Sequence, residues 1–152
     1  LSEMSFNSLL YSQEKTMKSK QFLKMLAQSL VLSGLAMEIA GNSRPCSGSE
    51  HLFCHAIDEL HDLKVPHGIL VALGSIVSCT LQGRDNTILL EYLNNYDISV
   101  NPISLDITKD KFVEAWMYAK ETRKERFTVL NTLNLTPSMF EKIYDNLLEV
   151  CK

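Results

Sequence analysis

Apolar residues recur three and four positions apart through most of the chain, which is the pattern of amphipathic helices. The clearest case is segment 49–63, whose apolar positions are Leu52, Phe53, Ala56, Ile57 and Leu60. Similar spacing predicts helices over 5–18, 86–96 and 109–122, and Thr136-Pro137 predicts the start of a last helix reaching residue 150. No strand-length stretch alternates between apolar and polar residues with turn signals on both sides. We therefore predict an all-α fold with about seven helices.

Two segments are more apolar than the rest. Residues 21–40 carry apolar side chains almost all round the helical axis, which predicts a buried helix that ends at Gly41. The uncharged stretch 65–83 is almost long enough to span a bilayer, but it contains polar residues and Pro66. We predict a buried helix there, with Pro66 in or near its first turn, and no membrane span.

The connections between these helices carry turn-forming residues. Segment 42–48 (N-S-R-P-C-S-G) predicts a loop, after which Ser47 or Ser49 would cap the next helix. Segment 100–107 is interpreted as a connection, and 128–135 fits either a strand or a helical turn. The sequence has no internal repeat or low-complexity tract. We expect one domain over residues 1–152.

Composition narrows the class of protein. The chain has 152 residues, of which 45% are hydrophobic and 22% charged, so a folded domain is expected rather than a disordered chain. At this length, folding hides roughly 70% of the surface of the unfolded chain. Fifteen Lys and Arg against eighteen Asp and Glu give a net charge of −3, which argues against DNA or RNA as a partner.

The four cysteines indicate a reducing compartment. Cys46, Cys54, Cys79 and Cys151 are irregularly spaced and form no C-x-x-C pair. We therefore expect free thiols and a cytosolic protein. Cys46 and Cys54 lie close to the histidines described next, but a buried free thiol is the commoner role for such residues.

The histidines give the strongest chemical signal, since all four lie within seventeen positions. On a helix, His51, His55 and Asp58 project within about 60° of one another. His67 begins the next predicted helix, whose first turn can fold back over that face. Two imidazoles from adjacent helices and a carboxylate suit a zinc, iron or nickel site with an open position. The alternative is that the pair of His51 and His55 only fills surface or core.

Other polar groups near this cluster carry weaker signals. His61 is turned about 80° from His51 and is expected to be a solvated partner of Asp58 and Asp62. The serines and Arg44 before the helix suit an anionic group at its N-terminus, although an ordinary capped turn explains them equally well. The basic run 123–126 contains glutamate and is interpreted as a solvated face. The six glycines include no G-x-G pair, so the chain encodes no nucleotide-binding loop.

Several motifs resemble a known family. They are L-V-L-S-G-L-A-M (30–37), S-R-P-C-S-G-S-E-H-L-F-C-H-A-I-D (43–58), P-H-G (66–68), V-A-L-G-S-I (71–76) and R-K-E-R-F-T-V-L (123–130). Over essentially the whole chain, the sequence resembles the C-terminal half of sn-glycerol-1-phosphate dehydrogenase. This family belongs to the fold group of glycerol dehydrogenase, iron-containing alcohol dehydrogenase and dehydroquinate synthase. The resemblance implies the helical, metal- and substrate-binding domain of such an enzyme.

The resemblance also implies particular roles. His51 and His67 would ligate the metal, and His55 would contact the substrate in catalysis. The metal would be zinc, with nickel or iron as alternatives, and the substrates dihydroxyacetone phosphate and sn-glycerol 1-phosphate. An N-terminal Rossmann-like half, which this chain lacks, would bind NAD or NADP, and the intact enzyme would be a homo-oligomer. The resemblance gives no metal-ligating role to Cys54.

Two departures from the family pattern bear on these expectations. The third metal ligand of the family is an aspartate upstream of this region, so the chain is expected to be an inactive piece of a longer enzyme. Ile69 stands where relatives usually carry an acidic residue, which leaves the support of His67 open.

Three other functions compete with this hypothesis. One is a related polyol or glycerol dehydrogenase, and another is a helical module that only binds or assembles with a partner. The third is a helical phosphohydrolase that uses His61 and Asp62 with His51 and His55, although such an enzyme needs further histidines that the chain lacks.

Overall fold

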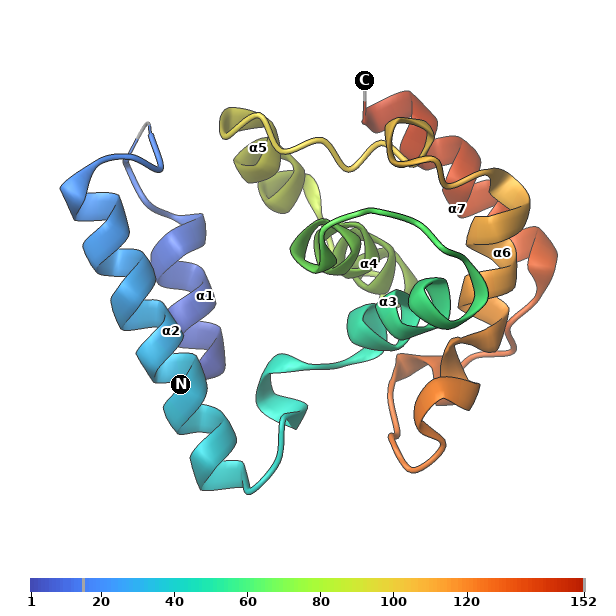
Figure 1. Ribbon diagram of the computed structural model, residues 1–152, viewed down its shortest axis with the longest axis horizontal. Helices are drawn as coiled ribbons and strands as arrows, with labels where there is room; N and C mark the ends of the chain where they lie inside the picture. Colours follow the sequence, from blue (N-terminus) through green and yellow to red (C-terminus); the bar gives the residue numbers. More distant parts are fainter. Residues whose placement is uncertain (15, 152) are drawn as a thin grey trace.

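The computed structural model describes residues 1–14 and 16–151, and this part of the chain forms seven α-helices and no strand. The helices are α1 (Ser2–Leu10), α2 (Lys20–Ala40), α3 (Ser49–Leu60), α4 (His67–Leu81), α5 (Thr87–Asn95), α6 (Lys109–Tyr118) and α7 (Pro137–Val150). Short 3-10 turns lie between them at η1 (Arg44–Cys46), η2 (Ile103–Leu105), η3 (Ala119–Arg123) and η4 (Val129–Asn131). The predicted all-α class and number of helices are confirmed (Figure 1).

Helices α3, α4, α6 and α7 lie together (Figure 1) and enclose the core. Aromatic rings fill the centre of this core. Trp116 is fully buried and stacks between Phe53, at a centroid distance of 4.6 Å, and Phe140, at 5.6 Å. Phe112 and Tyr144 extend this cluster, with ring centroids 5.3 Å apart. Trp116 is therefore the central residue of the core. We call these four helices the body of the molecule.

Helix α4 runs through the body and is packed closely against α3. Its four large apolar residues with no exposed surface are Leu70, Leu73, Ile76 and Val77. At Gly74 the two backbones approach so closely that an added Cβ would lie 2.9 Å from the Cα atom of Glu50. The Ser49 and Ser78 hydroxyl groups, both buried, lie 2.8 Å apart between the two helices. The predicted buried helix over 65–83 is therefore confirmed. The close packing of α4 against α3 fixes the position of α3 and of the side chains that it carries.

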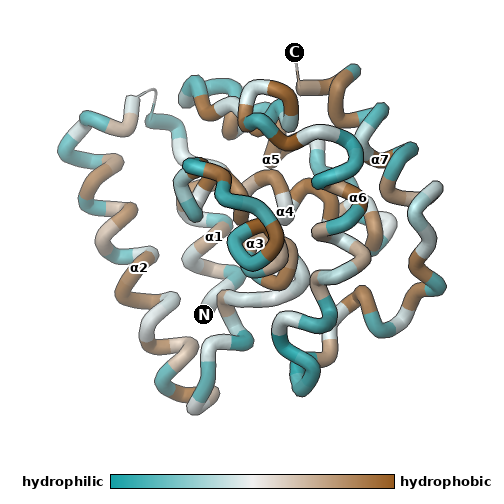
Figure 2. The backbone as a smooth tube through the Cα atoms, turned by 45° about the vertical axis from the view of Figure 1, so that its right-hand side comes forward, coloured by the Kyte–Doolittle hydropathy of each residue, from teal (hydrophilic) through white to brown (hydrophobic). Residues whose placement is uncertain are grey.

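Helices α1 and α2 form a hairpin beside the body (Figures 1 and 2). The prediction that 21–40 is a buried helix is wrong. Only three residues of α2 are buried, namely Phe22, Ser29 and Ala36. Val31 is 63% exposed and Ile39 is 76% exposed. By length and composition, α2 is also the one helix among the described residues that is long and apolar enough to cross a membrane.

The reason for this exposure is that α1 and α2 pack through serines. The Ser5 and Ser33 hydroxyl groups lie 2.8 Å apart, and those of Ser8 and Ser29 lie 2.9 Å apart. Small polar side chains thus occupy the interface, and the long apolar side chains of α2 point elsewhere. A pattern of apolar residues in the sequence indicates that a helix face favours burial, but it does not show which other segment covers that face.

Local boundaries also differ from the sequence expectation. The helix predicted over 5–18 ends at Leu10, and Lys15 of that segment lies outside the described residues. The ambiguous segment 128–135 holds the 3-10 turn η4. Neither predicted serine caps α3: Gly48 is the N-cap residue, and its N–H donates to the Glu50 side chain over 2.6 Å.

Candidate metal centre

One face of α3 and the first residue of α4 form a cluster of side chains that can bind a metal. His51, Cys54, His55 and Asp58 are spaced three and four apart, so they share that face of α3. His67 follows Pro66, the N-cap residue of α4, and its ring lies 5.4 Å from that of His51 and 6.5 Å from that of His55. The structure therefore brings together the three histidines that the sequence singled out.

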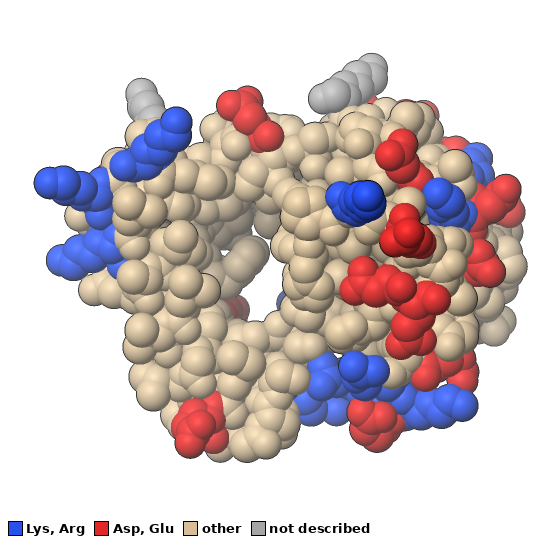
Figure 3. All heavy atoms as spheres, viewed as in Figure 1, with Lys and Arg blue, Asp and Glu red and all other residues tan. Residues whose placement is uncertain are grey.

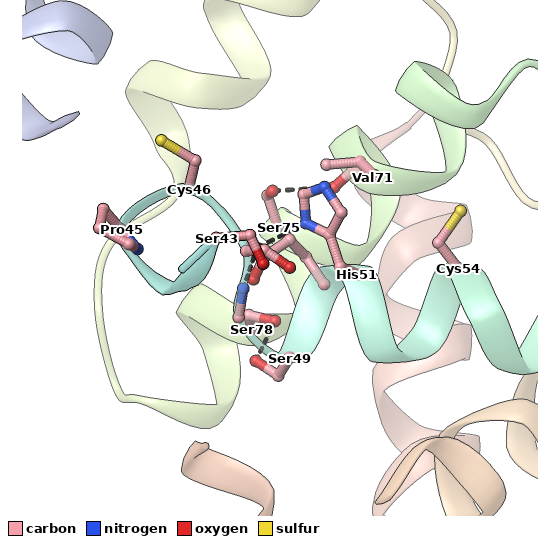
Figure 4. A network of polar contacts seen from close by, with 12 residues as sticks. Ser43, Pro45, Cys46, Ser49, His51, Cys54, Val71, Ser75 and Ser78 are labelled. Atoms are coloured by element: carbon pink, nitrogen blue, oxygen red, sulfur yellow. Dashed lines mark hydrogen bonds and ion pairs between the residues drawn. The ribbon is translucent and has the colours of Figure 1, made fainter. Parts of the chain in front are cut away.

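Glu50 orients His51. Figure 4 shows the ring of His51 on α3. The Glu50 carboxylate oxygen Oε1 lies 2.9 Å from His51 Nδ1, so the ring donates its Nδ1–H to Glu50 and leaves Nε2 free as an acceptor. Burial alone would raise the pKa of Glu50, but the hydrogen bonds from His51 and from the Gly48 N–H hold it below its usual value. A carboxylate that fixes the tautomer of a histidine in this way is typical of metal-binding imidazoles.

Cys54 is the partner of His67. Its Sγ lies 3.0 Å from His67 Nδ1 and has no exposed surface. Burial raises the pKa of the Cys54 thiol to about 12, and the nearby Asp58 carboxylate contributes to this rise. The sequence did not show which group orients the ring of His67, because Ile69 stands where an acidic residue is usual. In the structure this group is the sulfur atom of Cys54 on α3.

His55 lies at the open side of the cluster. Burial lowers the pKa of His55 below its usual value, and the positive charge of Arg123 lowers it further. Its imidazole is therefore neutral at neutral pH and can both donate and accept a hydrogen bond.

His61 is separate from this cluster, and the expectation that it is solvated is wrong. Its side chain is only 12% exposed, and its Nε2 lies 3.6 Å from a carboxylate oxygen of Glu114 on α6. At this distance the two groups form no hydrogen bond, and the Nε2 atom is buried without a partner among the described residues. His61 is thus part of the contact between α3 and α6.

The basic run 123–126 is only partly a solvated face. Lys124 pairs with Glu121 at the surface, as expected. Arg126, however, donates to the Ser47 hydroxyl over 2.5 Å and to the Ser43 hydroxyl over 3.0 Å. Arg126 therefore links the loop before α3 to the segment after η3. The hydroxyl groups of Ser43 and Ser47, which the sequence suggested as donors to an anion, are hydrogen-bonded to Arg126 instead.

The donor set fits a divalent cation of borderline softness. Two imidazoles bound to one tetrahedral zinc ion have ring centroids about 5 Å apart, which agrees with the 5.4 Å between His51 and His67. Sequence reasoning did not identify Glu50 as an orienting group or Cys54 as the partner of His67. An acidic residue directly before His51 was the available signal for Glu50, whereas the contact with Cys54 depends on how α4 folds back.

Comparison with known proteins identifies the relatives. The enzyme named glycerol-1-phosphate dehydrogenase [NAD(P)+] from Saccharolobus islandicus (strain L.S.2.15 / Lassen #1) is 40% identical over 124 residues, which cover 82% of this chain. The enzymes of the same name from Nitrosopumilus maritimus and Korarchaeum cryptofilum are 34% and 38% identical over 90% and 88% of the chain. The chain is homologous to part of glycerol-1-phosphate dehydrogenase.

The matched region is a minor part of each glycerol-1-phosphate dehydrogenase. It spans 35%, 38% and 43% of the three relatives in the order given. No family model matches the chain. The resemblance found in the motifs is thus confirmed, and the described part of the chain is all-helical.

Proposed function

We propose that this chain is the metal- and substrate-binding part of an NAD(P)-dependent glycerol-1-phosphate dehydrogenase. Such an enzyme interconverts dihydroxyacetone phosphate and sn-glycerol 1-phosphate. The observation that carries the proposal is the convergence of His51, His55 and His67 between α3 and α4, in a chain homologous to enzymes of that name.

Two imidazoles would hold the metal ion, which is zinc in this proposal, with nickel or iron as alternatives. His51 offers Nε2, because Glu50 holds the proton on Nδ1. His67 faces His51 from the N-terminal turn of α4. A dication held there would supply Lewis-acid chemistry, that is, it would polarise the ketone carbonyl of the substrate and stabilise negative charge on its oxygen.

His55 would act on the substrate instead of the metal. Its neutral ring, next to the charge of Arg123, can donate a hydrogen bond to a substrate oxygen or move a proton to and from it.

Because only His51 and His67 ligate the metal in this proposal, the third ligand is an aspartate of another segment. The NAD(P)-binding Rossmann-like domain also lies outside this chain, the intact enzyme is a homo-oligomer, and we place it in the cytosol.

A chimeric enzyme tests the function. The matching segment of the Saccharolobus islandicus enzyme is replaced by this chain, and reduction of dihydroxyacetone phosphate by NADH or NADPH is followed by absorbance. We expect turnover by the chimera and none by the isolated chain. A folded, metal-loaded chimera without turnover contradicts the proposed substrate, and turnover by the isolated chain contradicts the assignment of cofactor binding elsewhere.

The same chimera separates the roles of the histidines. His51→Ala and His67→Ala should each abolish retention of the metal after dialysis, measured by atomic emission. His55→Ala should retain the metal and lower turnover by about 100-fold or more, the usual contribution of a proton-transfer group. Equal metal loss in all three variants would contradict the division between ligands and substrate contact.

A further inference from the structure

Cys54, Asp58 and His67 form a second set of metal donors that shares one histidine with the proposed catalytic site. One ligand atom from each of the three residues lies within 4.8 Å of the other two. Cys54 and Asp58 are four positions apart on α3, and His67 faces them from the start of α4. We propose that these residues bind a thiophilic dication such as zinc through Cys54 Sγ, His67 Nδ1 and an Asp58 carboxylate oxygen.

The distance between the sulfur and nitrogen donors is close to what such a site needs. A tetrahedral zinc ion with bonds of about 2.3 Å to sulfur and about 2.0 Å to nitrogen places these two atoms about 3.5 Å apart. Cys54 Sγ and His67 Nδ1 are 3.0 Å apart. Small side-chain rotations that move each of these atoms by a few tenths of an ångström would bring them to the separation expected around zinc. Both residues stand on helices, α3 and α4, whose backbones pack closely against each other at Gly74.

Burial and charge also suit a metal ion. Cys54 closes the inner end of the set, whereas Asp58 and His67 are exposed, so an ion can enter from solvent and keep an open fourth position. A thiolate, a carboxylate and a neutral imidazole together carry a charge of −2, which balances the charge of the dication. This combination of sulfur, nitrogen and oxygen donors favours zinc over the hard cations Mg²⁺ and Ca²⁺.

The set differs from the proposed catalytic site in which atoms it uses. His51 has no part in it, and His67 contributes Nδ1, which faces Cys54. The proposed catalytic site would use the other ring nitrogen, and because a neutral imidazole has only one nitrogen free to bind a metal, His67 serves one of the two ions at a time. The proposal therefore does not depend on the dehydrogenase function. It adds a thiol ligand that lies four residues before Asp58 and one residue before His55.

Cobalt binding to the 152-residue chain tests the proposal, because a cobalt–thiolate bond has a near-ultraviolet charge-transfer band that imidazole and carboxylate ligands do not produce. We expect this band on addition of Co²⁺, with loss of the band when Zn²⁺ is added in competition. Cys54→Ser and His67→Ala should abolish the band, and Asp58→Asn should weaken cobalt affinity by at least about tenfold. X-ray absorption of the zinc form should show one sulfur neighbour at about 2.3 Å.

Two matched variants serve as controls. Cys79→Ser removes another partly buried thiol, and His51→Ala removes the histidine of the other site; both should retain the band. Absence of the band from the parent chain overturns the proposal, as does a band that survives Cys54→Ser or disappears with Cys79→Ser. A band lost with His51→Ala also overturns it, because a single site around His51 would then explain the binding. Asp58 is exposed, so Asp58→Asn decides the matter if Cys54→Ser fails to fold.

Discussion

The body and the α1–α2 hairpin use similar apolar sequences in opposite ways. In the body, Phe53, Trp116 and Phe140 have no exposed surface, whereas Leu30, Val31 and Ile39 of α2 are mostly exposed. Figure 3 shows the hairpin side with few charged atoms along its length and an opening between it and the body. The comparison teaches that the body is stabilised by contacts within this chain, while the hairpin presents apolar side chains that this chain does not cover.

The hairpin contacts the rest of the chain at each of its two ends. At one end, the Tyr96 hydroxyl donates to the Glu14 carbonyl oxygen over 2.7 Å, and the rings of Phe22 and Tyr96 lie 5.3 Å apart. At the other end, the Ser2 hydroxyl donates to the Pro45 carbonyl oxygen. Because His51 and His67 stand on α3 and α4, the geometry of the candidate metal centre depends on the body and not on the uncovered face of α2.

The largest effect is expected for removal of the central ring of the body. Trp116→Ala leaves a cavity between Phe53 and Phe140 and should lower the free energy of unfolding by about 3–5 kcal/mol. Urea unfolding followed by circular dichroism measures the loss. Phe127→Ala is the matched control, since Phe127 is 61% exposed and should change stability by less than about 0.5 kcal/mol. Similar losses in both variants would contradict the assigned core.

Substitution of one glycine in the body and one in the hairpin tests whether the two regions differ in how closely their backbones are packed. A Cβ at Gly74 of α4 would lie 2.9 Å from the Cα and carbonyl oxygen atoms of Glu50, whereas a Cβ at Gly34 of α2 would have no atom within 4 Å. Gly74→Ala should therefore cost about 1–3 kcal/mol of stability by overpacking. Gly34→Ala should stabilise the chain by up to about 1 kcal/mol, because alanine favours a helix.

Gly74→Ala should also affect the metal centre, since Glu50 must move and it holds the ring of His51. Isothermal titration with zinc, carried out in the Cys54→Ser background so that the thiol does not contribute, should then show weaker binding by Gly74→Ala and unchanged binding by Gly34→Ala. Equal affinities in the two variants would mean that the close packing of α3 on α4 does not position His51.

Sequence patterns predicted the fold class and the convergence of the histidines, because both follow from short-range spacing. His51, His55 and Asp58 share a face through helical geometry alone, and Pro66 marks where the next helix begins. What the patterns did not predict depends on contacts across long separations. His61 lies close to Glu114 of α6, and the environment of α2 depends on serine pairs with α1.

The smallest effect on stability is expected for the exposed face of α2. The double substitution Val31→Ser, Ile39→Ser replaces side chains that stay in solvent in the folded chain, so each change should cost no more than about 0.5 kcal/mol. Phe22→Ser on the same helix is the control, because Phe22 is buried against Tyr96 and its loss should cost more. Urea unfolding compares the three chains.

Self-association of the same variants sharpens the comparison. An uncovered apolar face favours contact with other apolar surfaces, so light scattering should detect association of the parent chain that the double variant reduces. Phe22→Ser should not reduce it, because that residue contributes nothing to the exposed face. If the double variant instead unfolds as readily as Trp116→Ala, then Val31 and Ile39 are buried within the chain in solution. The division of the molecule into a self-sufficient body and an uncovered hairpin would then be wrong.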